Sequence, residues 1–151
     1  MIKWRDVELP GSAGTLAGVS AERRATLLAH LRDTLPASAV PYTSSASKFT
    51  PAPIGDYPDA CAACGGSCCR LGGDTAFLTA DTLRFIWRDH PRLSKDELIA
   101  AYAERVPDQA VEGSCIFHTA QGCNLPGHLR SVICNTYLCA PLKAMALRGE
   151  K

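Results

Sequence analysis

The chain has no long apolar run and no strong excess of charge of either sign. No segment reaches the roughly 18 to 20 apolar residues that a membrane helix needs, and even the uncharged run between Glu112 and Arg130 contains glycine, proline and two histidines. Sixteen Lys and Arg residues face 15 Asp and Glu residues, so there is no broad basic field to hold nucleic acid or an anionic membrane. We therefore expect neither a membrane span nor a nucleic-acid partner.

Large aromatic rings and a secretion signal are scarce as well. Aromatic residues make up 7% of the 151 residues against 46% for all apolar types, which is enough for a core, but a lean one. This length suits one domain. The first residues mix charges of both signs, and a Gly/Ser-rich stretch follows Pro10, which matches a signal peptide poorly. We therefore expect a cytoplasmic protein.

Three segments have the pattern of capped amphipathic helices. Residues 20–35 begin with a serine suited to the N-cap and repeat leucine at helical spacing. Thr79 can cap a helix through Asp89, and Ser94 with Glu97 forms a capping box for a third. Further helices are expected over residues 128–138 and after Pro141.

The fold class predicted from these patterns is mainly α, a small irregular single domain with a loop-built cysteine site. Only residues 77–78 and 115–117 look strand-like. We expect an N-terminal helix and a Pro/Ser-rich extended connector in residues 1–60, the cysteine domain in residues 61–142, and a short helix or tail in residues 143–151.

Cysteine is unusually frequent for a chain of this length, with eight copies. In a reducing compartment, clustered cysteines are more often metal ligands or redox groups than disulfides. The first group reads C-x2-C-x3-C-C, and Gly65 and Gly66 suit a knuckle turn with positive φ. Two adjacent thiols point to opposite sides in extended backbone, so they serve two centres or one of them faces the core. This group comprises Cys61, Cys64, Cys68 and Cys69.

The second group is dispersed and comprises Cys115, Cys123, Cys134 and Cys139. Eight thiols allow two sites of four thiolates, or one four-thiolate cluster with further cysteines beside it. Because several thiolates around one ion leave a net negative charge, Arg70 and Arg130 are candidates to offset it from beside the cofactor.

The ordered cysteines, with Arg130-x3-Cys134 and Tyr137-x-Cys139, resemble the bacterial YkgJ-type cysteine-cluster family, a zinc- or iron-chelating CxxCxxCC domain. The resemblance covers roughly residues 61–142. The first group here is one residue longer than the family's usual CxxCxxCC spacing. The resemblance implies a chelated metal, with an iron–sulfur cluster such as 4Fe-4S slightly favoured over Zn²⁺ because a relative, flagellin lysine methylase, uses such a cluster.

The function predicted from the sequence is therefore cytosolic metal binding by all eight cysteines. One alternative is a redox or transfer enzyme with a reactive cysteine. Another is an adaptor that binds a protein partner through residues 1–60, with structural zinc. His118 and His128 could supply nitrogen ligands, but we expect them to be loop residues or hydrogen-bond partners, since eight thiols are available.

Overall fold

The computed structural model describes residues 2–11, 14–38, 60 and 63–149. Its α-helices are α1 (Ala21–Thr34), α3 (Ala80–Arg88), α4 (Lys95–Ala103), α5 (Val132–Thr136) and α6 (Ala140–Leu147), and its 3-10 helices are η3 (Ser67–Leu71) and η4 (Gly127–Leu129). Its strands are β1 (Ile2–Trp4), β2 (Val7–Leu9), β3 (Leu16–Gly18), β4 (Gln109–Val111), β5 (His118–Thr119) and β6 (Gly122–Cys123).

The strands pair into two-stranded antiparallel sheets: β1 with β2, β3 with β4, and β5 with β6. The prediction of a mainly α fold is therefore wrong, because the described chain is mixed α/β. The first hairpin could have been found, since Ile2 and Trp4 alternate with Lys3, which lies opposite Glu8 across the pair. The β3–β4 pair joins segments far apart in the chain, and strands this short leave almost no local periodicity to detect.

The three capped helices are confirmed. Ser20, Thr79 and Ser94 are the N-caps of α1, α3 and α4, and Ser94 and Glu97 form the capping box. Their apolar faces pack into one core with the segment 115–117. Leu27, Leu31 and Leu35 of α1 are 0 to 3% exposed, so the leucine stripe of this helix is used inside the domain.

The predicted helix over residues 128–138 is wrong as a continuous element. Arg130 and Ser131 are extended, with ψ of 149° and 154°, and they separate η4 from α5. The Ser131 hydroxyl accepts a hydrogen bond from the Cys134 N–H at 3.2 Å and so starts a new helix. The following helix, α6, carries Pro141 in its first turn, as Pro prefers.

The two strand-like segments are also not strands. Ala76 and Phe77 have positive φ of 52° and 58°, so the chain turns there. Residues 115–118 form a turn closed by a hydrogen bond from the His118 N–H to the Cys115 carbonyl at 2.9 Å. Most of the predicted connector, residues 39–59, lies outside the described residues.

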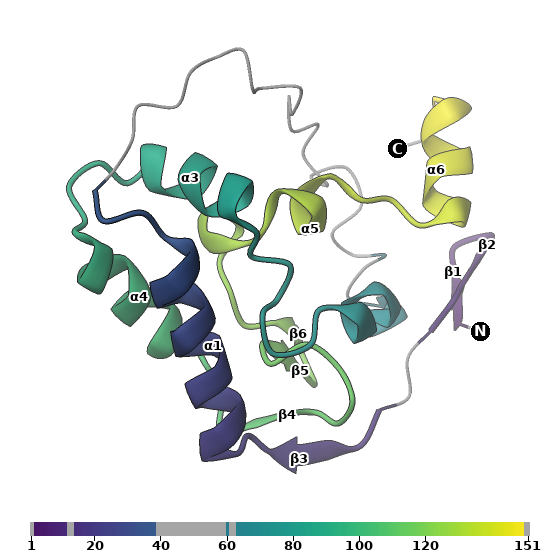
Figure 1. Cartoon of the computed structure of the whole chain (residues 1–151). Helices are drawn as coiled ribbons and strands as arrows, with labels where there is room; N and C mark the ends of the chain where they lie inside the picture. The colour runs from purple at the N-terminus through teal and green to yellow at the C-terminus, as the bar shows by residue number, and fades with distance from the viewer. Residues whose placement is uncertain (1, 12–13, 39–59, 61–62, 150–151) are drawn as a thin grey trace.

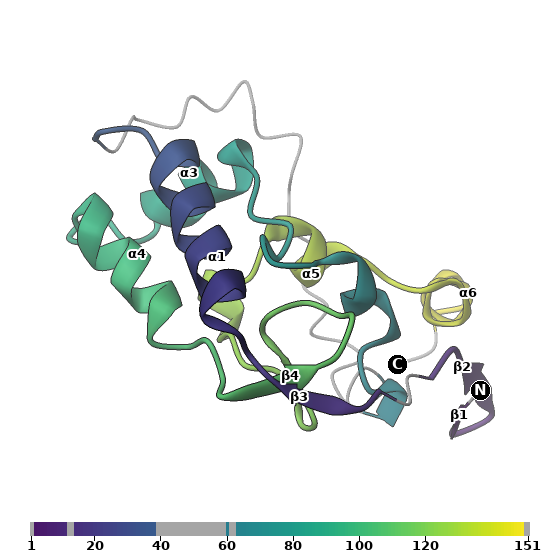
Figure 2. The same cartoon turned by 60° about the horizontal axis from the view of Figure 1, so that its bottom comes forward.

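Two groups of buried side chains organise the described chain. Figures 1 and 2 show α1, α3 and α4 gathered on one side, with the β1–β2 hairpin beside α6 at the other end. A second, smaller core lies at that end and consists of Leu9, Ala60, Cys64, Leu142 and Met145. No described helix combines the length and the apolar character that crossing a bilayer requires.

The core of the helical side gives a first prediction. Leu31→Ala, at 0% exposure, should lower the free energy of unfolding by about 2–5 kcal/mol through lost burial and a cavity. The same substitution at Leu71, which is 84% exposed, should stay within about 0.5 kcal/mol of the parent. Urea denaturation measures both, and equal effects would contradict this assignment of the core.

Candidate functional site

The knuckle between the first cysteines is built by two glycines. Gly65 and Gly66 have positive φ of 70° and 78°, as predicted, and they lead into η3. A Cβ on Gly66 would lie 2.7 Å from His118 Nε2 and 3.1 Å from Cys69 Sγ. Only glycine therefore fits at this position, both for its backbone angle and for its neighbours.

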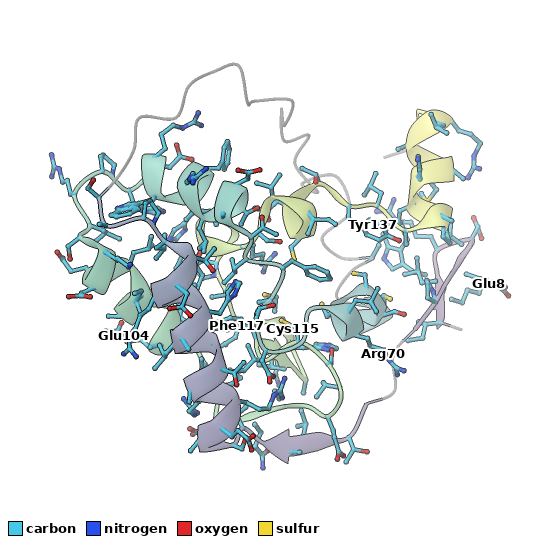
Figure 3. All side chains as sticks on the ribbon, in the orientation of Figure 1. Glu8, Arg70, Glu104, Cys115, Phe117 and Tyr137 are labelled. Atoms are coloured by element: carbon cyan, nitrogen blue, oxygen red, sulfur yellow. The ribbon has the colours of Figure 1, made fainter. Side chains whose placement is uncertain are left out.

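The segment that carries Cys115 docks directly on η3. The Cys115 N–H donates to the Cys69 carbonyl at 3.1 Å, and the Ile116 N–H donates to the Gly73 carbonyl at 2.9 Å. A Cβ on Gly72 would lie 2.8 Å from Cys115 Cβ, so this glycine allows the close approach. Figure 3 places Cys115 and Phe117 in the interior of the molecule.

Cys123 and Cys134 arrive from two further elements. Cys123 lies in β6, paired with His118 of β5, and its Sγ accepts a hydrogen bond from the Leu125 N–H at 3.4 Å. Cys134 lies in α5, which is anchored to α3 because the Val132 N–H donates to Thr82 Oγ1 at 3.1 Å.

These thiols are close enough to influence one another's ionisation. The pKa of Cys115 is raised to about 12, mainly by burial and also by the charges of Cys123 and Cys134, while the Phe117 N–H opposes the rise. Burial also raises the pKa of Cys134, helped by Cys123 and Cys68. These two thiols therefore stay protonated near neutral pH unless a cation offsets the charge of the thiolate.

The adjacent pair of cysteines behaves as one titrating unit. A hydrogen bond from Cys69 lowers the pKa of Cys68 to about 6. The pKa of Cys69 is raised by that same bond, then by burial, and then by the charges of Cys68, Cys115 and Cys123. The pair thus loses one proton readily and holds the second.

Five of the predicted ligands therefore converge, from η3, the 115–118 turn, β6 and α5: Cys68, Cys69, Cys115, Cys123 and Cys134. Cys64 and Cys139 belong to the second core near Leu142 and Met145. Cys61 lies outside the described residues. All seven described cysteines are free thiols.

Two arginines oppose the rise in the pKa values of Cys115 and Cys134, and only one of these arginines was predicted. The Arg130 guanidinium favours ionised Cys134, and its Nε donates to the Leu125 carbonyl at 2.8 Å. Arg23 of α1 favours ionised Cys115 while it bonds Asp74 and the Ser114 carbonyl. Arg23 was missed because the sequence of a helix surface does not indicate which arginine lies near a cysteine far away in the chain. Arg70 is exposed on η3.

The two candidate histidines have other roles. His118 is 2% exposed and both of its ring nitrogens are engaged, Nδ1 with Ser114 Oγ at 2.7 Å and Nε2 with the Gly65 carbonyl at 2.6 Å. The His128 ring lies against the His90 ring, with centroids 5.1 Å apart and the planes tilted by 48°. The expectation that these residues are hydrogen-bond partners or loop residues is confirmed for His118.

A cleft of about 470 Å³ opens beside Cys123. Its lining is polar and uncharged, with the amide side chains of Gln109, Gln121 and Asn124 among it. The half-buried Cys123 forms part of the wall.

The fit of the five thiols to a metal can be tested on their present positions. Among the described residues, no group of three or more Cys, His, Asp or Glu side chains is arranged to hold a metal ion. The thiols shift one another's pKa values, but their present positions form no such group. Rotation about the Cα–Cβ bonds between staggered positions is the smallest change that redirects a cysteine Sγ.

No family model, curated protein or solved structure matches this chain. The resemblance to the YkgJ-type family therefore stays a prediction based on cysteine spacing.

The Cys68–Cys69 pair gives a pH-dependent prediction for the metal-free protein. Because the pKa of Cys68 is lowered to about 6, its alkylation by iodoacetamide should rise through pH 6 and level off by about pH 7. Cys69→Ala removes the donor that stabilises the thiolate, so the midpoint should move up toward the ordinary value of about 8.5.

Mass spectrometry of the alkylated peptide, at a series of pH values, measures this midpoint under anaerobic conditions. Cys139→Ala, in the second core, is the matched control and should leave it unchanged. A wild-type midpoint above pH 8 would contradict the predicted role of Cys69.

Proposed function

We propose that this chain is a cytoplasmic metal-binding protein of the YkgJ type, in which clustered thiolates hold an iron–sulfur cluster or a zinc ion. The observation that carries the proposal is that five thiols from four separate segments of the chain lie close enough to shift one another's pKa values. A cytoplasmic location is part of the proposal, because such thiols stay reduced in that compartment.

The energetics of the buried thiols favour a cation among them. Burial disfavours the thiolate form of Cys115 and Cys134, and the other thiolates disfavour it further. A bound divalent cation or an iron–sulfur cluster removes both penalties, because it attracts the thiolates that repel one another without it. The Leu125 N–H on Cys123 and the Phe117 N–H on Cys115 supply the donors that metal-bound thiolates use.

The donor atoms restrict the kind of metal. The convergence consists of sulfur donors, and the nearest histidine, His118, has both ring nitrogens engaged. All-thiolate sites suit zinc or iron–sulfur clusters rather than hard cations such as Mg²⁺ or Ca²⁺. An iron–sulfur cluster is slightly favoured over zinc, because the YkgJ-type family that this chain resembles includes a relative that uses such a cluster.

A second candidate is redox or transfer chemistry by a reactive cysteine, which one observation favours. Cys68 is exposed and accepts a hydrogen bond from Cys69. An accessible thiolate of this kind is the usual nucleophile in thiol chemistry. If Cys68 remains as reactive in the metal-loaded protein as in the metal-free protein, this candidate gains support, and full protection of Cys68 by metal counts against it.

The proposed function gives a prediction about metal content. Protein purified anaerobically should carry zinc, or iron with acid-labile sulfide and a brown colour. Cys115→Ser removes the most buried of the five thiols and should reduce metal affinity at least about tenfold. Elemental analysis and the absorption spectrum measure both properties.

Cys139→Ser is the control, because Cys139 is a half-buried cysteine of the second core. It should keep the metal content of the wild-type protein. A wild-type protein that stays metal-free after incubation with Zn²⁺, and after anaerobic incubation with iron and sulfide, would overturn the proposal. So would a Cys115→Ser protein with unchanged affinity.

A further inference from the structure

The thiols of Cys68 and Cys69 are in direct contact. The Cys69 S–H donates a hydrogen bond to Cys68 Sγ, and the backbone N–H groups of both residues also donate to that sulfur. Neighbouring side chains of a 3-10 helix diverge by about 120°, so the contact is a particular feature of this pair. Cys68 is exposed and Cys69 is half-buried. A reagent from solvent can therefore reach the first sulfur, and the second sulfur lies next to it.

The backbone of Cys69 connects η3 to the rest of the site. The Cys69 N–H donates to the Gly66 carbonyl at 2.9 Å. The Cys69 carbonyl accepts from the Gly72 N–H at 3.0 Å and from the Cys115 N–H at 3.1 Å. The bonds to the glycines join η3 to its two caps, and the bond to Cys115 docks the distant segment. A change in the backbone of Cys69 therefore acts on both η3 and the docking contact.

We propose that Cys68 and Cys69 are a redox dithiol, which a low-molecular-weight disulfide oxidises to a disulfide between the two neighbours, and that this oxidation loosens η3 from the segment of Cys115. The inference deepens the second candidate function, the reactive cysteine, by naming its resolving thiol and the chemical class of its substrate. It does not depend on a metal site.

The reaction consists of two thiol–disulfide exchanges. Cys68 gives up its proton, and its sulfur attacks one sulfur of the external disulfide R–S–S–R, whose S–S bond breaks. One R–S⁻ leaves and takes up a proton, so that a mixed disulfide of Cys68 remains. The Cys69 sulfur then attacks the Cys68 sulfur, and the second R–S⁻ leaves and takes the proton of Cys69. The dithiol is oxidised by two electrons, and the external disulfide is reduced to two thiols.

The product is strained, which makes the oxidation reversible. Neighbouring Cα atoms are about 3.8 Å apart across a trans peptide, whereas disulfides usually join Cα atoms roughly 4.4–6.8 Å apart. The small ring also contains the Cys68–Cys69 peptide, whose N–H bonds the Gly66 carbonyl. The backbone must therefore leave its 3-10 conformation when the ring closes. Strained, exposed disulfides of this kind are the labile and regulatory ones.

A disulfide between Cys68 and Cys134 is the competing product. Cys134 lies near enough to Cys68 for their charges to interact, but the hydrogen bond holds Cys69 in contact with Cys68. Trypsin cleaves after Arg70 and Arg130. A Cys68–Cys69 disulfide therefore stays within one peptide, whereas a Cys68–Cys134 disulfide joins two peptides.

The test treats the full-length protein, as purified and after a chelator has removed any metal, with oxidised glutathione under anaerobic conditions. Mass spectrometry of the chelator-treated protein should show the loss of two hydrogen atoms, with the disulfide inside the peptide that ends at Arg70. Cys69→Ser should stop at the mixed disulfide with one glutathione, and Cys68→Ser should react at least about tenfold more slowly. Cys134→Ser is the matched control and should form the same disulfide as the wild-type protein.

Hydrogen exchange measures the effect on the docking contact. The Cys115 amide, which bonds the Cys69 carbonyl, should exchange at least about tenfold faster in the oxidised protein than in the reduced protein. The Leu98 amide, which bonds the Ser94 carbonyl in α4, is the internal control and should not change. Dithiothreitol should restore slow exchange at Cys115. Equal exchange at Cys115 before and after oxidation would overturn the coupling between the dithiol and this contact.

The outcomes distinguish this inference from the functions proposed above. A disulfide to Cys134, or a wild-type protein that stops at the glutathione adduct, overturns the redox dithiol and leaves the reactive Cys68 standing. A chelator-treated protein in which Cys68 reacts with neither oxidised glutathione nor iodoacetamide overturns both. The metal site is decided separately, by metal content and by the Cys115→Ser variant.

Discussion

The docking of the 114–118 turn on η3 is the constraint on which the candidate site depends. Three hydrogen bonds make this contact: His118 Nε2 to the Gly65 carbonyl, the Cys115 N–H to the Cys69 carbonyl, and the Ile116 N–H to the Gly73 carbonyl. Gly66 and Gly72 lack the Cβ atoms that would prevent it. Without this contact, the segment of Cys115 would not lie against the segment of Cys69.

The helical part of the fold could be predicted because its signals are local. A cap hydroxyl and a leucine or aromatic stripe lie within one turn of each other at Ser20, Thr79 and Ser94, and each of these helices begins where its cap indicates. The break at Arg130 was missed although Ser131 is a good N-cap, because the spacing of Arg130 and Cys134 also fits a continuous helix. The β3–β4 pair joins segments far apart in the chain, and the strands of the two hairpins are only two or three residues long. The sequence patterns therefore gave the wrong fold class.

The candidate site was predictable as a set of residue types and not as an arrangement. Spacing identified the glycine turn and the arginine beside Cys134. Spacing could not show that Cys139 lies with the second core while Cys134 lies near the other thiols. That difference depends on where α5 ends and on the second core that forms around Leu142. Arg23 and Ser114 lie about 90 residues apart in the chain, and the hydrogen bond from the Arg23 guanidinium to the Ser114 carbonyl joins their segments. The β3–β4 pair joins the same parts of the chain.

The long separation between the cysteines has a consequence during synthesis. Cys69 leaves the ribosome 65 positions ahead of Cys134. At translation rates of about 5–20 residues per second, Cys134 is therefore synthesised roughly 3 to 13 seconds after Cys69. For the first 49 positions of that interval, until His118 is synthesised, the Gly65 carbonyl lacks its hydrogen-bond donor. The first thiols are then open to oxidants and to stray metal ions. The order of residues along the chain thus leaves the first cysteine group exposed to these reactions before its partners are made.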